Sequence, residues 1–248
     1  MTYCVAIISV DAGLVFCSDS RTNAGIDQVS TYSKMFRFGV DGERSFVILS
    51  AGNLATTQGV IAKIKRDIRD NAETSLLTVK TLVDAADYIG ELSLAQQHKL
   101  TDGGAIFEAS FILGGQIKGD RHEIHLIYPA GNHITTSKDT PYLQIGESKY
   151  GKPILDRILT PTTSLETASL CALVSMDSTM RSNLTVGPPI EISVYKKDSL
   201  LSSRHQRFDA QSSFLNELNR NWDSKLNEAF KQLPPLDWPA ETPQSDDE

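Results

Sequence analysis

The chain has 248 residues, of which 40% are hydrophobic and 22% are charged, and its formal net charge is −7. This composition is ordinary for a globular protein, and the length is sufficient to bury a large core. The acidic balance argues against nucleic-acid binding, which depends on a basic surface. The densest basic cluster lies within residues 63–69, where it is interrupted by Asp67 and followed by Asp70. We therefore expect this cluster to be a solvated helix face.

Cysteine usage indicates a reducing compartment. The chain has three cysteines, Cys4, Cys17 and Cys171, an odd number without a CxxC spacing. Cys4 and Cys17 lie in apolar stretches, where a free thiol behaves as a small hydrophobe. The sequence shows no charged-then-apolar leader and no apolar run of the roughly 20 residues that a membrane span needs. We expect a cytoplasmic protein that has no membrane partner.

The chain is predicted to begin with a β-hairpin. Apolar runs at 4–8 and 14–17 flank a glycine-containing turn, which is the pattern of two paired strands. The return strand carries Asp19 back toward Thr2. Arg21 comes two residues later, on the same side of an extended chain as Asp19.

A second pair of strands is predicted after the hairpin. The chain is expected to turn at 23–25, and the excursion that starts there ends at 33–36, which includes Lys34. The apolar strand 45–53 then ends at Gly52, directly before a helix. The first third of the chain is thus expected to contain four strands.

The remaining elements alternate between helix pairs and strands. Apolar stripes at helical spacing predict helices at 60–68, 82–92, 154–159 and 165–176. Further strands are predicted near 107–117, 122–128, 141–145 and 190–195. This order is expected if helices cover both outer faces of two stacked sheets. Periodicity alone gives only the α+β class.

Residues 198–248 extend beyond this core. Apolar positions between 215 and 230 mark one face of a helix, which two prolines end. The stretch 234–248 is acidic and Pro-rich and is predicted to be disordered. We expect a domain at 1–197, a linker with an amphipathic helix at 198–233, and a tail at 234–248. The sequence leaves open whether the helix packs on its own domain or on a neighbouring subunit.

Thr2 stands directly behind the initiator methionine. A threonine at a mature N-terminus can supply both nucleophile and base, because its α-amine, with a pKa of about 7.7–8.0, can accept the hydroxyl proton. This chemistry requires the removal of Met1. A lone Met-Thr start is more simply the edge of a first strand, so the interpretation depends on motifs elsewhere in the chain.

Four motifs in order resemble the catalytic pattern of proteasome β-subunits and the bacterial HslV peptidase. They are Thr2 and the segments 18–21, 33–34 and 50–53. The stretches 109–115 and 125–131 are similar to the central hairpin of the same family. The resemblance covers roughly residues 2–197. It is greatest to the bacterial branch called Anbu, the ancestral β-subunit, because the chain begins Met-Thr and continues past the β-subunit core.

The resemblance implies a four-layer αββα sandwich of the N-terminal nucleophile hydrolase type, with an extra C-terminal helix. It makes Thr2 the nucleophile, and it makes Asp19 the partner that orients Lys34. The Lys34 ammonium would then favour the alkoxide of the threonine. Gly52 would direct a backbone N–H toward the oxyanion, and Arg21 would support the site.

These residues also have simpler structural interpretations. Asp19 and Arg21 could form a strand-end ion pair that holds the hairpin. Lys34 could be an exposed lysine of a polar strand, and Gly52 could merely end a strand before a helix. The combination of all four motifs in order favours the functional interpretation.

The second half of the site departs from the family pattern. Family members carry a serine after a glycine ahead of the third helix, and here either Glu147 or Ser148 could match it. We select Ser148 as a supporting residue. After the fourth helix, Asp177 comes early, while Ser182 and Asn183 occupy the stretch where the family has an aspartate. The group that positions the amine therefore stays open.

The predicted function is a threonine-type peptidase in a large homo-oligomer, a ring or a spiral. Its substrates would be peptides or unfolded proteins, delivered by an unfoldase, if any, that the sequence does not identify. The alternatives are an amide hydrolase of the same fold and a catalytically silent assembly subunit. No cofactor or metal is expected. His122 and His125 are three apart in a strand and point to opposite faces, which forbids joint ligation of a metal.

Overall fold

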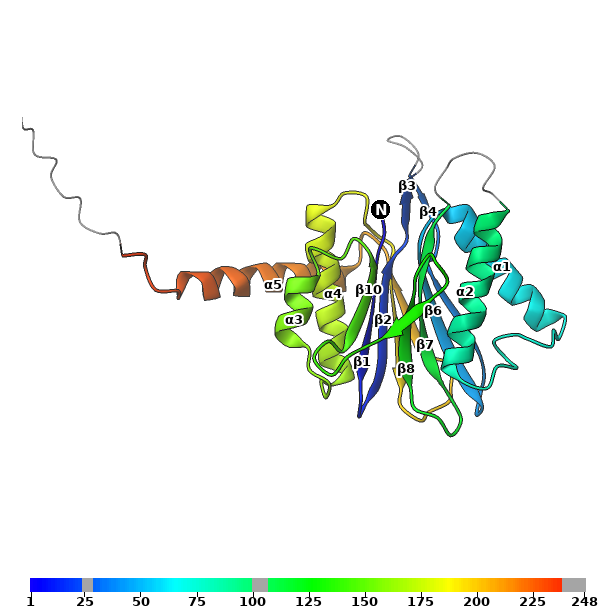
Figure 1. Cartoon of the computed structure of the whole chain (residues 1–248). Coiled ribbons are helices and arrows are strands. Elements are labelled where there is room, and N and C mark those ends of the chain that lie inside the picture. The colour runs from blue at the N-terminus through cyan, green and yellow to red at the C-terminus, as the bar shows by residue number, and fades with distance from the viewer. Residues whose placement is uncertain (24–28, 100–106, 238–248) are drawn as a thin grey trace, which may run out of the picture. The chain divides into compact units, whose positions relative to one another are not determined.

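The computed structural model describes residues 1–23, 29–99 and 107–237. Within this part of the chain, two five-stranded antiparallel sheets face each other, and helices cover their outer faces (Figure 1). The chain divides into two compact units, Met1–Ser212 and Ser213–Glu248. The first unit has the predicted four-layer αββα architecture.

The N-terminal hairpin lies at the centre of the first sheet. In sheet order, the strands are β10 (Tyr142–Gly146), β1 (Tyr3–Ser9), β2 (Gly13–Asp19), β11 (Ile190–Lys196) and β12 (Arg204–Phe208). The predicted hairpin is present, and Cys4 pairs with Ser18 across it. Because β1 pairs with β10 on its other side, the N-terminus is held between two strands.

The second sheet contains the strand that ends at Gly52. Its strands, in order, are β5 (Met35–Val40), β6 (Arg44–Gly52), β7 (Ala109–Ile117), β8 (Glu123–Ile127) and β9 (His133–Thr135). A separate two-stranded ribbon consists of β3 (Arg21–Asn23) and β4 (Val29–Thr31). This ribbon connects the end of β2 to Lys34, directly before β5.

Helices cover the outer face of each sheet. The pair on the second sheet is α1 (Leu54–Arg69) and α2 (Leu82–His98), and the pair on the first is α3 (Lys152–Ile158) and α4 (Leu165–Ser182). Three of these helices have side-chain N-caps. Asn53 caps α1, Ser164 caps α4, and a capping box with Asp84 begins α2. Such caps satisfy backbone donors that a helix leaves unpaired at its N-terminus.

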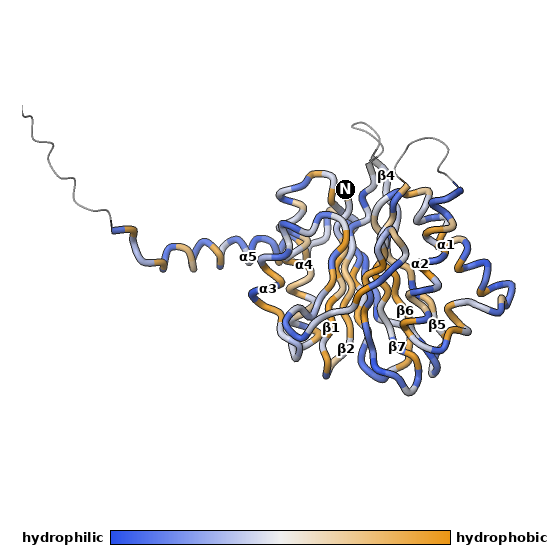
Figure 2. The backbone as a smooth tube through the Cα atoms, viewed as in Figure 1, coloured by the Kyte–Doolittle hydropathy of each residue, from blue (hydrophilic) through white to orange (hydrophobic). Residues whose placement is uncertain are grey.

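The two sheets enclose an apolar core. Leu14 and Phe16 of β2 pack in one cluster with Leu49 of β6 and Ile112 of β7, and each is fully buried. Burying such a side chain contributes about 1.5–3 kcal/mol. Figure 2 shows this hydrophobic character along the central strands. The core fixes the relative positions of strand ends that later form the site.

Four strands were not predicted, namely β3 and β4 of the ribbon, β9 and β12, and the last of these moves the end of the domain. β9 is a three-residue strand on the edge of its sheet. β12 is polar and mostly exposed, yet it pairs with β11 along Ile190–Val194. The first unit therefore continues to Ser212, whereas the sequence placed a linker from residue 198. An exposed edge strand lacks the apolar alternation on which strand prediction depends.

In its described residues, 213–237, the second unit contains one helix, α5 (Ser213–Lys231). Its apolar residues recur every three or four positions, as the sequence predicted: Leu215, Leu218, Trp222, Leu226 and Phe230. None of its residues is buried. Residues 238–248 of the predicted tail lie outside the described residues. Among the described helices, none is long and apolar enough to span a membrane.

Candidate active site

Most of the predicted site residues lie at the ends of strands from both sheets. Thr2 precedes β1, Asp19 ends β2, Lys34 precedes β5 and Gly52 ends β6. A cleft of about 460 Å³ is lined by Thr2, Arg21, Lys34 and Gly52 together with neighbouring residues. Residues far apart in the sequence thus share one cavity, because antiparallel pairing returns each strand to the same edge.

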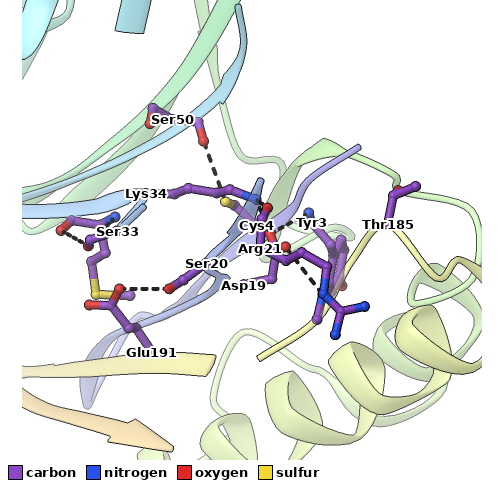
Figure 3. A network of polar contacts seen from close by, with 12 residues as sticks. Tyr3, Cys4, Asp19, Ser20, Arg21, Ser33, Lys34, Ser50, Thr185 and Glu191 are labelled. Atoms are coloured by element: carbon purple, nitrogen blue, oxygen red, sulfur yellow. Dashed lines mark hydrogen bonds and ion pairs between the residues drawn. The ribbon is translucent and has the colours of Figure 1, made fainter. Parts of the chain in front are cut away.

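A buried ion pair lies beside this cleft. Lys34 Nζ is 2.7 Å from Asp19 Oδ1, and the two side chains are 9% and 0% exposed (Figure 3). Lys34 Nζ also donates to the Arg21 carbonyl oxygen at 2.7 Å. Two fixed acceptors therefore hold the ammonium, so Lys34 is not the exposed lysine that a polar strand would present.

Asp19 connects this ion pair to the N-terminus. Oδ1, which accepts from Lys34, also accepts from the backbone N–H of Tyr3 at 3.1 Å, and Oδ2 accepts from the N–H of Gly187 at 3.4 Å. Burial raises the pKa of the Asp19 carboxyl, and the Lys34 charge and the two backbone donors oppose this shift. One carboxylate oxygen thereby positions both Lys34 and the residue that comes after Thr2.

Arg21 holds a loop rather than pairing with Asp19. Its guanidinium donates to the carbonyl of Leu184 at 2.6 Å, and its backbone N–H donates to the carbonyl of Gly187 at 3.3 Å. A Cβ on Gly187 would approach the guanidinium carbon to 2.4 Å, so the missing side chain leaves room for the guanidinium in this position. The strand-end ion pair considered from the sequence is thus formed by Asp19 with Lys34, while Arg21 ties β3 to the segment before β11.

Gly52 occupies a position that only glycine tolerates. Its φ is +108°, and a Cβ there would lie 2.4 Å from the carbonyl oxygen of Glu108. Asn53 is the next residue and caps α1 by accepting from the N–H of Thr56 at 3.1 Å. The strand therefore ends in a close backbone approach beside the cleft, at the N-terminus of a 16-residue helix.

The N-terminus itself lies in the electrostatic field of the site. The pKa of the Met1 α-amine is lowered by burial and by the Lys34 charge, while Asp19 and Glu147 oppose the shift. The Thr2 carbonyl accepts from the Glu147 N–H at 2.7 Å. Gly146, with φ +83°, lies so close that a Cβ would be 2.0 Å from the same carbonyl oxygen.

The residues considered for the second half of the site differ in burial and in their hydrogen-bond partners. Glu147 is buried and accepts from Asn183 Nδ2 at 3.3 Å. Ser148 is exposed, and its carbonyl oxygen accepts from Gln144 at 3.4 Å. Asp177 accepts from Arg181 within α4 at 2.9 Å. Ser148 thus keeps its supporting role only as a prediction.

Sequence reasoning missed a buried phenol directly behind Thr2. Tyr3 is 0% exposed, and its hydroxyl lies 3.0 Å from Ser175 Oγ and accepts from Gln144 Nε2 at 2.9 Å. A Cβ on Gly151 would lie 2.4 Å from this hydroxyl. A tyrosine at the start of an apolar strand could have indicated such an anchor, because a buried phenol requires hydrogen-bond partners.

Comparisons with known sequences and structures differ in outcome. No protein-family model matches the chain, and no curated protein matches it. Solved structures match it over almost its whole length.

Anbu (ancestral beta-subunit) from Yersinia bercovieri is 44% identical at a TM-score of 0.90, with 95% of this chain and 100% of that chain covered. The helical assembly of the Anbu complex from Pseudomonas aeruginosa contains a chain 46% identical at a TM-score of 0.91, with coverage of 95% and 98%. A Gly-1 mutant of Anbu from Hyphomicrobium sp. strain MC1 is 42% identical at a TM-score of 0.90, with coverage of 96% and 100%. With identity above 40% over nearly the entire length of all three, and with the predicted αββα fold, this chain belongs to the Anbu family of proteasome-like proteins.

Proposed function

We propose that this protein is a threonine-type N-terminal nucleophile peptidase whose nucleophile is Thr2 after removal of Met1. The observation that carries the proposal is the buried Lys34–Asp19 ion pair on the cleft that Thr2 and Gly52 also line. A buried charge pair is costly to maintain for stability alone, so its position beside a nucleophile favours a chemical role.

Removal of Met1 frees the amine that serves as the base. The Thr2 Oγ proton passes to this α-amine while Oγ forms a bond to the carbonyl carbon of the substrate. The Lys34 ammonium favours the developing negative charge on Oγ, and Asp19 keeps that ammonium in place. The carbonyl electrons move to the substrate oxygen, toward which the Gly52 N–H would donate.

The intermediate then expels the amine of the cleaved peptide bond. The C–N bond breaks as the Thr2 ammonium returns its proton to the leaving nitrogen, so the product leaves as a neutral amine. An ester on Thr2 Oγ remains. Water loses a proton to the same α-amine and adds to the ester carbon. The C–Oγ bond then breaks, the ammonium returns its proton to Oγ, and the acid product is released.

The proposed assembly rests on the membership of this chain in the Anbu family. The Pseudomonas aeruginosa relative forms a helical assembly, and we propose that this chain also forms a large homo-oligomer. Its second unit carries an apolar helix face along α5 with no buried residue, which a neighbouring copy could cover. A peptide or an unfolded protein is the substrate class that we propose.

A test combines intact-mass analysis with covalent labelling. Purified protein is incubated with a β-lactone, and the N-terminal peptide is then analysed by mass spectrometry. We expect the main species to lack Met1 and to carry the acyl group on Thr2, and Thr2→Ala to abolish both labelling and hydrolysis of a fluorogenic peptide.

Each contrary outcome identifies a different error. Full activity from chains that retain Met1 would disprove the single-residue mechanism. Labelling of Thr2 without hydrolysis of any peptide would favour the amide hydrolase, which small amide substrates would then test. Mature protein that assembles but is not acylated would indicate a silent assembly subunit.

A further inference from the structure

Glu147 lies directly opposite Thr2 across a strand pair. The register of β1 and β10 ends at Tyr3 paired with Gly146, so the next position places Glu147 opposite Thr2. The Glu147 N–H donates to the Thr2 carbonyl at 2.7 Å, which continues the ladder by one further bond. The positive φ of Gly146 allows the chain to approach Thr2 this closely. Glu147 therefore has a fixed backbone position beside the nucleophile.

The side chain of Glu147 is buried in a polar setting. The residue is 7% exposed, whereas the adjacent Ser148 is exposed. Oε2 accepts from Asn183 Nδ2 at 3.3 Å, and Oε1 faces the Lys149 N–H at 3.5 Å. The Asn183 amide cannot be reversed without loss, because its Oδ1 already accepts from both the N–H and the hydroxyl of Thr185. The amide is therefore fixed with its donors toward the carboxylate.

Among the residues that the structure describes, this carboxylate has neutral donors but no basic side chain as a partner. Among the described residues, the ion pairs of lysine, arginine and histidine do not include Glu147. A buried carboxylate without a cation is unfavourable. The chain's own N-terminal ammonium is within its electrostatic range, because Glu147 favours the protonated form of that amine.

We propose that Glu147 is the positioning residue for the α-amine of Thr2, a role that rests on the peptidase mechanism proposed above. After Met1 leaves, the new ammonium or amine donates to the Glu147 carboxylate, and Asn183 holds that carboxylate in place. No proton moves to Glu147. The carboxylate orients the amine toward Oγ and stabilises the ammonium that forms when the amine takes the hydroxyl proton.

The charges around the amine explain why such a partner is needed. Lys34, which stands before β5, disfavours a second positive charge nearby, while Asp19 of β2 is already occupied by Lys34 and by the backbone of β1. Arg21 of β3 lines the same cleft and adds positive charge. A second carboxylate on the other side of Thr2 offsets these cations. It thereby makes the proton transfer from Oγ to the amine less unfavourable.

The test measures the pH dependence of acylation for the full-length protein. The rate at which a β-lactone acylates Thr2 is monitored by intact mass across about pH 5–9, where the free amine is required and the rate rises with pH. We expect Glu147→Gln to lower the apparent pKa of this rise by about 1 unit and to reduce the rate at high pH about tenfold. Glu147→Asp should show a smaller pKa shift and a smaller loss of rate than Glu147→Gln, since the charge remains but lies one methylene farther back.

The matched control is Glu166→Gln. Glu166 is an exposed carboxylate in the first turn of α4, at the opposite end of the helix from Asn183. Its removal makes the same change in net charge and should leave the pH profile unchanged. A purely structural role of Glu147 would lower the yield of folded protein or the rate at all pH values, without moving the apparent pKa. An unmoved pKa in folded Glu147→Gln, or in Glu147→Asp if the first variant does not fold, overturns the proposal.

A second measurement does not depend on peptidase activity. Periodate cleaves an N-terminal threonine between Cα and Cβ through its free amine and hydroxyl, so the pH dependence of that oxidation reports the same amine. The Glu147→Gln variant should show the same downward shift in this reaction. If wild-type protein is never acylated but the periodate profile shifts, the peptidase proposal fails and the placement of Glu147 stands. An unshifted periodate profile in folded variants overturns the placement.

Discussion

Replacing Asp19 by Asn tests the central ion pair most directly. Asn keeps the size of the side chain and one carbonyl oxygen, which can still accept from Lys34 and from the Tyr3 N–H. The charge is lost, however. In the wild-type protein the Gly187 N–H donates to Oδ2, and in the variant this N–H faces an amide NH₂ that cannot accept. Lys34, with its side chain 9% exposed, becomes a buried cation without a counterion.

The expected cost arises from that uncompensated charge. Removing one partner of a buried pair typically costs about 3–5 kcal/mol. For a protein of this size each kcal/mol lowers Tm by about 2–4 °C, so Asp19→Asn should lower Tm by about 10 °C. Asp11→Asn is the matched control, because Asp11 is exposed at the tip of the same hairpin. It should change stability by less than about 0.5 kcal/mol.

The assays are equilibrium urea unfolding for the free energy and thermal unfolding for Tm, both at pH 7 and a single protein concentration, since self-association contributes to apparent stability. A double variant, Asp19→Asn with Lys34→Met, removes both charges, and it should cost less than the sum of the two single changes. A cost below about 1 kcal/mol for Asp19→Asn, or strictly additive costs in the double variant, would refute the reasoning. Either result would mean that the ion pair contributes little to holding the site.

Two further predictions concern backbone geometry and pH. Gly146→Ala should destabilise the protein far more than Gly42→Ala: both glycines have φ near +80°, but a Cβ at Gly146 would lie 2.0 Å from the Thr2 carbonyl oxygen and one at Gly42 meets nothing within 4 Å. Thermal unfolding should show that Gly42→Ala lowers the free energy of unfolding by about 1 kcal/mol. Equal losses in the two variants would contradict the close approach of Gly146 to the Thr2 carbonyl. Burial lowers the pKa of His125 below its ordinary 6.5, so the unfolded chain binds more protons and stability should fall as pH drops below 6.5. His125→Gln should flatten this part of the urea-unfolding profile, and a slope identical to wild type would contradict it.

Much of the fold could be predicted because its elements have clear periodicity. The hairpin of β1 and β2, the helices α1 to α4 and β11 all show apolar patterns typical of their structures. β12 lacks such a pattern, since four of its five residues are exposed and only Phe208 is buried. Its place in the sheet depends on backbone pairing with β11, which no local pattern reports.

The chemical environment of single charged residues was less predictable. Asp67 was interpreted as part of a solvated helix face, yet it is buried, accepts from the Tyr88 hydroxyl at 2.7 Å and pairs with Lys63. Helical spacing locates a residue on its helix but does not reveal a tyrosine on a neighbouring helix. Glu147 and Asn183 show the same limit, because their contact joins positions 36 residues apart. The sequence could name both residues as candidates without showing that they meet.

The candidate site residues lie at the ends of paired strands, which hold their positions rigidly. The Tyr3 N–H and Lys34 Nζ bind the same oxygen of Asp19, so the residue after Thr2 and the cation share one anchor. The Thr2 carbonyl is held on the opposite side by the Glu147 N–H. These positions are set by paired strands around a fully buried core rather than by loops, and rigid elements maintain side-chain geometry better than loops do. Removal of Met1 can therefore expose the Thr2 amine while the β1 ladder and the Asp19 anchor hold the residue where it is.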